Sequence, residues 1–200
     1  MLSIKTRQKY LKALGLYNGS IDGVEGKLTK GAYKLLQNKF FARRKDVDGK
    51  YGNNTDILLQ SAYNLKDSKY FSLPEFKCHC NTKYCTGYPA VVSKDLVDNL
   101  DKLRKWAGAP IVITSPLRCL KWNALQGGVS SSYHTKGKAT DIYCSKYSHS
   151  LESRKKMINK FLTYSNSNMG YCNGYMKYKG GSIIKYTSKT MGNATHIQVN

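Results

Sequence analysis

Apolar residues recur with helical spacing through the first third of the chain and predict three short amphipathic helices. The first helix is expected at about residues 4–15, because Leu16-Tyr-Asn-Gly-Ser follows as a stop signal. Two apolar runs mark the other helices: Ala32, Leu35, Leu36 and Phe40 in one, and Ile57, Leu58, Ala62 and Leu65 in the other. We therefore expect residues 1–66 to form a small all-α domain of three helices.

A mixed pattern of helical and alternating segments follows a short linker at about residues 65–70. Helices are expected at residues 93–106, 120–126 and 151–164, and strands at 111–115 and 138–143. Two or three further strands are expected between Tyr171 and Val199, with breaks at Gly170, Gly174 and the Gly180-Gly181 pair. Residues 71–200 are thus expected to form an α+β domain with a small antiparallel sheet.

The first 66 residues contain an internal repeat. The motif Asp-Gly-x-x-Gly-x-x-Thr occurs at residues 22–29 and again at 48–55, 26 residues later. Glycine permits the positive φ of a tight turn, and the aspartate can accept hydrogen bonds from backbone amides inside that turn. Three helices joined by Asp-Gly turns resemble the peptidoglycan-binding domain found beside many cell-wall hydrolases. The alternative is a generic three-helix bundle with favourable turn residues.

Composition and hydropathy narrow the class of protein. A chain of 200 residues suits one large or two small domains, and 40% hydrophobic residues suffice to form a core. No run of 18 apolar residues occurs, so no membrane insertion is expected. The first residues, Met1-Leu-Ser-Ile-Lys-Thr-Arg, contain neither the apolar segment nor the cleavage site of a secretory signal peptide.

The chain is strongly basic, with 33 Lys and Arg against 12 Asp and Glu and a formal net charge of +21. Such a surface attracts polyanions, with an affinity that falls as salt rises. Nucleic acid and the anionic polymers of a bacterial wall both fit this charge. The charge is spread along the chain without a basic tail, so it does not distinguish nucleic acid from wall polymers. A basic surface that only keeps the protein in solution is the alternative.

The most specific chemical signal is a set of three potential zinc ligands. His134 and Asp141 lie in Ser-Ser-Ser-Tyr-His-Thr-Lys-Gly-Lys-Ala-Thr-Asp-Ile-Tyr, and His196 lies in Ala-Thr-His-Ile-Gln-Val near the end of the chain. Zinc binds imidazole nitrogen and carboxylate oxygen, and a catalytic site with three protein ligands leaves a position for water. Asp141 and His196 lie in alternating segments, so both are expected on strands that place them rigidly.

The residues around these ligands resemble the zinc D-Ala-D-Ala carboxypeptidase and L-Ala-D-Glu endopeptidase family, whose zinc-site fold is shared with the hedgehog signalling domain. The resemblance covers roughly residues 70–200. It implies Zn²⁺ as the cofactor, with His134, Asp141 and His196 as its ligands. It also implies that Arg118, in Thr-Ser-Pro-Leu-Arg-Cys, binds a substrate carboxylate, and that Ser132 contributes to substrate binding. A structural ion pair is the alternative role for Arg118.

Asn193 departs from the family pattern. Many members place Asp or Glu three residues before the last zinc histidine, as the general base, and an amide cannot accept that proton. No Asp or Glu occurs after Glu152, which leaves His149, Glu75 and Glu152 as candidates by elimination only. Three explanations stay open: Asn193 is an inactivating substitution, the base comes from elsewhere in the chain, or the domain binds wall peptides without cutting them efficiently.

Six cysteines require a separate interpretation. Cys78, Cys80 and Cys85 form Cys-x-Cys-x4-Cys, which differs from the usual pairs of zinc-binding cysteines. The others are Cys119, Cys144 and Cys172. Without a visible signal peptide we expect mostly reduced, packed thiols. A second metal site or a disulfide is the less favoured alternative.

Together these features predict a two-domain peptidoglycan hydrolase, with a wall-binding module before a zinc metallopeptidase of D,D-carboxypeptidase or L-Ala-D-Glu endopeptidase type. Its expected partners are bacterial peptidoglycan and anionic wall polymers rather than nucleic acid. The size, the targeting module and the lack of a visible signal peptide resemble a bacteriophage endolysin, which acts first in the host cytoplasm and then at the wall. A bacterial wall-remodelling enzyme, extracellular or wall-associated, is the alternative. A non-catalytic zinc-containing recognition protein is the rival from another class.

Overall fold

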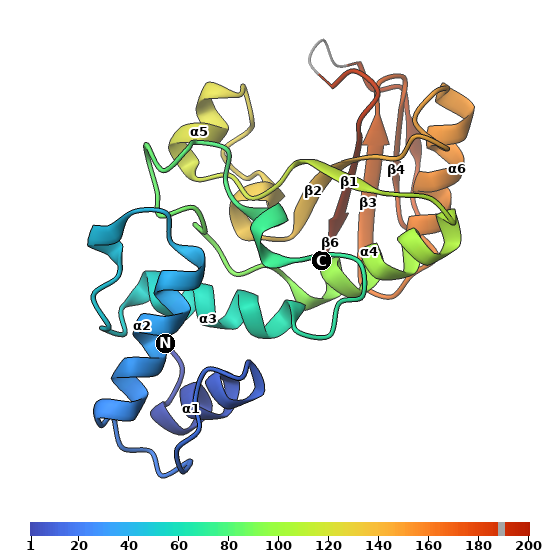
Figure 1. Ribbon diagram of the computed structural model, residues 1–200. Coiled ribbons are helices and arrows are strands. Elements are labelled where there is room, and N and C mark those ends of the chain that lie inside the picture. Colours follow the sequence, from blue (N-terminus) through green and yellow to red (C-terminus); the bar gives the residue numbers. More distant parts are fainter. Residues whose placement is uncertain (188–190) are drawn as a thin grey trace.

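A computed structural model describes residues 1–187 and 191–200 and shows helices in the first part of the chain and a sheet in the second (Figure 1). The first part contains α1 (Ile4–Ala13), α2 (Lys27–Phe40), α3 (Asn53–Leu65) and the short 3-10 helices η1 (Arg44–Asp46) and η2 (Leu73–Phe76). The helices of the second part are α4 (Lys94–Ala107), α5 (Leu120–Leu125), the 3-10 helix η3 (Tyr133–Lys136) and α6 (Leu151–Phe161). The mixed α+β class predicted from sequence is confirmed.

The two copies of the repeated turn have the same pattern of hydrogen bonds. The side chain of Asp22 accepts a hydrogen bond from the amide of Val24 at 2.9 Å, and that of Asp48 accepts one from the amide of Lys50 at the same distance. In each copy a buried glutamine of the preceding helix donates its amide to that aspartate, at 2.7 Å for Gln8. The equivalent donation from Gln37 measures 2.9 Å.

The same two glutamines complete each turn in the same way. Their side-chain oxygens accept the amides of Gly23 and Gly49, which have φ of +83° and +70°. The turn chemistry expected from the Asp-Gly motif is therefore present. The glutamines that fill both turns escaped sequence analysis, since they lie on the helix before each motif rather than within it.

One expected core position of the helical part is wrong. Leu35 was grouped with Ala32 and Leu36, but its side chain is 56% exposed while theirs are buried. The buried face of α2 instead includes Tyr33 and Gln37, which follow the helical spacing of Thr29 and Ala32. The run is apolar and helical, as predicted, but Leu35 lies outside the buried stripe of the helix.

The second part is built on a six-stranded antiparallel sheet with the order β1-β2-β6-β3-β4-β5. The strands are β1 (Val112–Ser115), β2 (Ala139–Tyr143), β3 (Ser167–Cys172), β4 (Tyr175–Tyr178), β5 (Ile183–Ile184) and β6 (Thr195–Val199). The last strand of the chain pairs with β2 on one side and β3 on the other. All five residues of β6 are buried, as expected for a strand between two neighbours.

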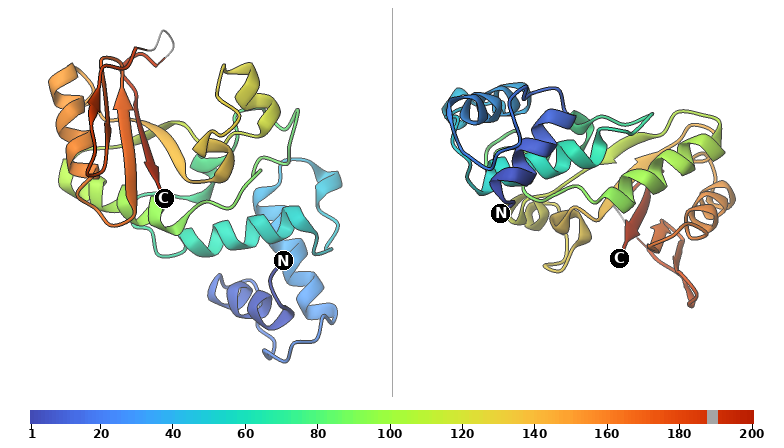
Figure 2. Two further views of the ribbon diagram at one scale, coloured as in Figure 1. Left: turned by 180° about the vertical axis from the view of Figure 1, so that it is seen from behind. Right: turned by 90° about the horizontal axis from the view of Figure 1, so that it is seen from below.

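Helices α4 and α6 pack together and against the same central strands, as the views of Figure 2 show. This packing explains a second wrong expectation. Gly170 lies inside β3 rather than at a break, and a Cβ at this position would lie 2.9 Å from the Ile158 side chain of α6. Glycine is used here because the helix lies close to the strand, whereas Gly174, at φ +95°, does mark a turn.

The helical part joins the rest through α3. The Asn64 side chain donates to the carbonyl of Val92 at 2.8 Å, and the Val92 amide donates to the Ser61 hydroxyl at 3.0 Å. Buried apolar side chains form one continuous cluster from Leu11 to Val199. Residues 1–66 and 71–200, the domains predicted from sequence, thus share a packed interface in the structure.

No helix in the part of the chain that the structure describes is long and apolar enough to cross a membrane.

Candidate metal centre

Four side chains form a row across the centre of the sheet. In the strand register Ser115 lies opposite Asp141, Asp141 opposite His196, and His196 opposite Tyr171. Side chains directly opposite each other on paired strands project from the same face. The antiparallel pairing therefore brings Asp141 and His196 together although 55 positions separate them in the chain.

His134 reaches this row from η3, the short helix that precedes β2. Gly137 ends η3 with φ +72°, and its carbonyl accepts the Ser93 amide at 2.9 Å. A Cβ at Gly137 would lie only 1.9 Å from the carbonyl oxygen of Val91. Glycine is thus required between the helix that carries His134 and the strand that carries Asp141.

The ligand atoms of the three predicted residues converge on one point. His134 Nε2 lies 3.1 Å from His196 Nδ1 and 3.3 Å from Asp141 Oδ1, and His196 Nδ1 lies 2.8 Å from Asp141 Oδ1. In a tetrahedron with zinc–ligand bonds of about 2.0–2.1 Å, neighbouring ligand atoms are about 3.3 Å apart. The three donors therefore fit one zinc ion with little adjustment.

Hydrogen bonds outside the three ligands orient both imidazoles. His134 Nδ1 lies 2.9 Å from the carbonyl oxygen of Pro116, and because a carbonyl only accepts, Nδ1 carries the proton. His196 Nε2 lies 3.2 Å from Oε1 of Gln198, whose amide nitrogen donates to Asn168. Each ring then directs an unprotonated nitrogen at the shared point, which is the arrangement of a metal-binding histidine.

Arg118 orients the third ligand. Its Nη2 donates to Asp141 Oδ2 at 3.0 Å, which leaves Oδ1 directed at the two histidines. The hydroxyl of Ser115 accepts from Nε and Nη2 of the same guanidinium, at 3.0 and 2.7 Å. The ion pair that sequence analysis held as the alternative role of Arg118 is therefore present.

Burial and polar contacts shift the pKa values of two ligands. Desolvation lowers the pKa of His134, whose side chain is 3% exposed, so the neutral imidazole is favoured. Burial alone would raise the pKa of Asp141, but its polar contacts with the imidazoles of His134 and His196 outweigh burial and hold this pKa well below its usual range. Both shifts favour the protonation states that bind metal.

An aromatic side chain closes one side of the centre. The ring of Tyr171 stacks on the imidazole of His196, with ring centroids 4.2 Å apart and planes 15° from parallel. Burial raises the pKa of Tyr171, so its hydroxyl stays protonated at neutral pH. The stacked ring restricts the rotation of the His196 imidazole.

Asn193 lies beside a buried arginine. Arg154 Nη1 donates to the side-chain oxygen of Asn193 at 3.2 Å and to the carbonyl of Ser148 at 2.8 Å. Arg154 is 8% exposed, and none of the ion pairs among residues 1–187 and 191–200 includes it. The position expected to hold the general base is thus occupied by a neutral partner of a buried cation.

The other candidate bases have local contacts. Glu75 accepts from the amide and hydroxyl of Ser72 and so caps η2. Glu152 pairs with Lys155 at 3.6 Å in the first turn of α6, and its side chain is 70% exposed. His149 lies 3.2 Å from the Ser153 hydroxyl at the start of the same helix. All three side chains thus make contacts at the beginning of a helix.

Ser132 precedes η3 as its N-cap residue. Its carbonyl accepts the amide of Thr135 at 3.1 Å and the Thr135 hydroxyl at 2.6 Å. Ser132 is half-buried and lies two residues before the ligand His134. The backbone role is clear from these contacts, and its expected contact with substrate stays a prediction.

Three residues that surround the ligands were not predicted from the sequence. Ser115, Tyr171 and Gln198 belong to the centre only through the pairing of strands far apart in the chain. The alternation of β6 places Gln198 on the same face as His196, which is the one signal that could have found it.

Comparison with known proteins supports the same assignment. A family model described as Peptidase M15 matches residues 69–172, just over half of the chain. The matched range includes Arg118, His134 and Asp141, while His196 lies beyond its end and joins them through the sheet. A search of curated proteins found no match. The match over residues 69–172, together with the His-Asp-His centre, shows that this chain belongs to the peptidase M15 family.

Proposed function

We propose that this chain is a zinc-dependent hydrolase of bacterial peptidoglycan that cleaves an amide bond in the stem peptide. M15 peptidases are zinc-dependent metallopeptidases. The observation that carries the proposal is the convergence of His134 Nε2, Asp141 Oδ1 and His196 Nδ1 within 3.3 Å of one another. Each of these atoms is left unprotonated by the hydrogen bonds that its residue makes elsewhere.

When bound, zinc would lower the pKa of a coordinated water and polarise the scissile carbonyl. The protein's own groups hold the ligands in place for this chemistry. The Pro116 carbonyl and the Gln198 side chain fix the two imidazoles, and Arg118 fixes the carboxylate. Such outer contacts typically change metal affinity or activity by about 10–100-fold when they are removed.

Arg118 has a second proposed role in binding the substrate carboxylate. Its Nε and Nη2 are engaged by Ser115 and Asp141, whereas Nη1 makes no hydrogen bond to any residue that the structure describes. The side chain is 16% exposed, so this donor is available at a partly open site. We propose that Ser132, half-buried before His134, adds a contact to the same substrate.

The helical part and the overall charge support a target in the cell wall. Two copies of the Asp-Gly turn, each filled by a buried glutamine, resemble a peptidoglycan-binding module. The net charge of +21 suits anionic wall polymers. We propose an endolysin role, with wall binding by residues 1–66 and cleavage by residues 71–200.

The second candidate function is a zinc-containing recognition protein that binds wall peptides without efficient cleavage. The observation in its favour is Asn193, whose side chain accepts a hydrogen bond from Arg154 at 3.2 Å and offers no basic group. A bound water would then lack the acid–base assistance that is worth about 10²–10⁴-fold in rate.

Digestion of purified cell walls separates the two functions. We expect the full chain to release muropeptides whose masses identify the bond as that of a D,D-carboxypeptidase or an L-Ala-D-Glu endopeptidase. His134→Ala, which removes one ligand, should release none while still sedimenting with the walls. Equal product from both proteins would refute zinc-dependent cleavage, and sedimentation without product from the parent chain would establish the recognition function.

A further inference from the structure

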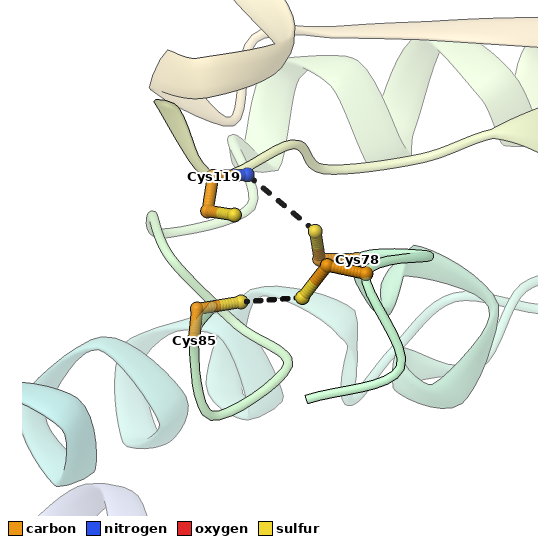
Figure 3. A group of neighbouring side chains, drawn as sticks. Cys78, Cys85 and Cys119 are labelled. Carbon is orange, nitrogen blue, oxygen red and sulfur yellow. Dashed lines mark hydrogen bonds between the residues drawn. The ribbon is translucent and has the colours of Figure 1, made fainter. Parts of the chain in front are cut away.

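A second group of potential metal ligands lies apart from the His-Asp-His centre. The sulfur atoms of Cys78, Cys80, Cys85 and Cys119 all lie within 4.8 Å of one another. Three come from the loop after η2, and the fourth directly follows Arg118. Figure 3 shows the side chains of Cys78, Cys85 and Cys119 directed toward a common centre from these separate segments.

These thiols differ from ordinary buried cysteines of the same chain. Cys144 and Cys172 are buried among the aliphatic and aromatic side chains of the main core. Cys78, Cys80 and Cys119 instead form a small cluster of their own, with Cys85 and Trp122 packed against it. In this cluster the sulfur atoms are one another's neighbours, so the gathering does not come from general apolar packing.

The spacing between the sulfur atoms fits metal coordination better than disulfide bonding. Zinc–sulfur bonds of about 2.3 Å in a tetrahedron place sulfur atoms about 3.8 Å apart. The Cys80 and Cys85 sulfur atoms lie 3.5 Å apart, whereas a disulfide requires about 2.05 Å. All six cysteines of the chain are free thiols in the structure.

Backbone amides point at two of the sulfur atoms. The Cys119 amide donates to Cys78 Sγ, and the Gly87 amide donates to Cys85 Sγ, both at 3.4 Å. A neutral thiol is a weak acceptor, whereas a metal-bound thiolate carries charge that such amides stabilise. The same loop is closed by the bond from the Cys78 amide to the Gly87 carbonyl at 2.8 Å.

The backbone between the cysteines adopts an uncommon conformation. Asn81 and Thr82 are consecutive non-glycine residues with φ of +51° and +61°. A β-branched residue in this region is rare, and strained residues of this kind persist only where the surroundings determine them. This pair of residues reverses the direction of the chain, so that Cys85 lies beside Cys80.

An arginine from the helical part of the chain holds the loop. Arg43, from the segment after α2, donates to the carbonyl of Thr82 at 3.3 Å. Its Nε and Nη2 pair with Asp46 at 2.7 and 3.1 Å, so its charge is shared with that carboxylate. Arg43 thus fixes the backbone between Cys80 and Cys85 through a hydrogen bond.

We propose that Cys78, Cys80, Cys85 and Cys119 bind one Zn²⁺ ion in a closed site that serves the structure rather than catalysis. Four sulfur ligands in tetrahedral arrangement select zinc or iron, and a site with four protein ligands has no open position for substrate. The ion would join the loop of residues 78–85 to the segment that carries Arg118. The proposal does not rest on the proposed hydrolase activity, because the site shares no ligand with the His-Asp-His centre.

Metal analysis of the full chain tests the proposal. We expect two zinc ions per purified chain, and one in His134→Ala, where only the cysteine site remains. Cys119→Ser should lower the zinc content by one ion relative to the parent, while Cys172→Ser, a matched change at a buried cysteine of the main core, should not. One zinc in the parent and none in His134→Ala would overturn the proposal, as would iron in place of zinc.

Spectroscopy on His134→Ala provides a measurement that does not depend on whether the cysteine variants fold. Cobalt exchanged into this protein should give the intense near-ultraviolet charge-transfer band of thiolate ligands, which imidazole and carboxylate do not produce. A mercurial thiol reagent should release the remaining zinc ion. Absence of the band, or an intact mass lower by the hydrogens of one or two disulfides, would refute the site.

Discussion

Replacing Asn193 by Asp tests the largest open point of the proposed mechanism. The change restores a carboxylate where M15-type enzymes are expected to hold their base, and it alters charge with almost no change in volume. Because Asn193 is exposed, the new carboxylate requires little desolvation. Its nearest partner is the buried guanidinium of Arg154, whose Nη1 now donates to the Asn193 amide oxygen at 3.2 Å.

The structure gives the size of the expected stability change. Two unit charges 3.2 Å apart attract by about 1–5 kcal/mol when the effective dielectric constant falls from 80 to 20. Because one partner is exposed, the lower value applies, so we expect about 1 kcal/mol. For a chain of this size that corresponds to a rise of about 2–4 °C in melting temperature. Asn193→Ala, which removes the hydrogen bond to Arg154, should not show the rise.

The expected effect on catalysis is separate and larger. General-base assistance is worth about 10²–10⁴-fold, and pairing with Arg154 weakens the base, so we expect hydrolysis of wall peptides to rise at least about tenfold. Muropeptide release would be followed by mass spectrometry at equal zinc content. A more stable variant that is no faster than an active parent would place the base elsewhere. Inactivity of both proteins, with zinc and wall binding intact, would favour the recognition protein.

Three further changes test the support of the metal centre, the filled turn of the helical part and the pH dependence of its stability. Gly137→Ala should reduce the zinc content and lower the free energy of unfolding by several kcal/mol, because the new Cβ would lie 1.9 Å from the Val91 carbonyl oxygen. The control Gly127→Ala, at φ +68° with open space around it, should lower the free energy of unfolding by only about 1–2 kcal/mol and retain zinc. Gln37→Ala should lower the free energy of unfolding by about 2 kcal/mol or more in urea titrations, since its partners Asp48 and Gly49 lose their hydrogen bonds; an unchanged midpoint would refute the role of the filled turn. Burial would raise the pKa of Asp56, but bonds from the Tyr51 hydroxyl and the Leu2 amide lower it, so its contribution to stability is present above about pH 4 and is lost as pH falls further. Asp56→Asn should therefore make unfolding less dependent on pH below about pH 4, and an unchanged slope would contradict this reasoning.

Local rules predicted most of the helices and the immediate ligands. Helical spacing and stop signals placed α1, α4, α5 and α6 within a few residues of their observed ends. The motif around His134 and Asp141 pointed to the candidate metal centre because residue type and spacing are specific there. These features depend on neighbouring residues in the chain, which a sequence displays directly.

Features that depend on strand register could not be predicted in the same way. Gly170 was interpreted as a break because glycine is rare in strands, but the close approach of Ile158 from α6 determines it. Two or three strands were expected from Tyr171 to Val199, whereas the described residues form four, of which β3 already begins at Ser167. The additional strand β5 has only two residues and gives no alternating signal. Leu35 was assigned to a buried face because a run of apolar residues does not reveal which edge of the stripe faces solvent.

The cysteines show how a long-range contact changes the meaning of a motif. Cys-x-Cys-x4-Cys is incomplete as a zinc signature, and the expectation of packed thiols followed from that irregular spacing. The fourth sulfur belongs to Cys119, 34 positions after Cys85, and only the folded chain brings it within 4.8 Å of the others. Packed thiols describe Cys144 and Cys172, which lie in the main core.

The segment from Pro116 to Cys119 connects the two groups of ligands. The Pro116 carbonyl orients the His134 ring, the Arg118 amide donates to the His134 carbonyl at 3.2 Å, and the Arg118 side chain holds Asp141. The next residue, Cys119, donates its amide to Cys78. This four-residue segment thus contacts the first centre through Pro116 and Arg118 and contributes Cys119 to the second. If the cysteine site binds zinc as proposed, its ion restrains the backbone that positions Arg118, and catalysis depends on a metal that never contacts substrate.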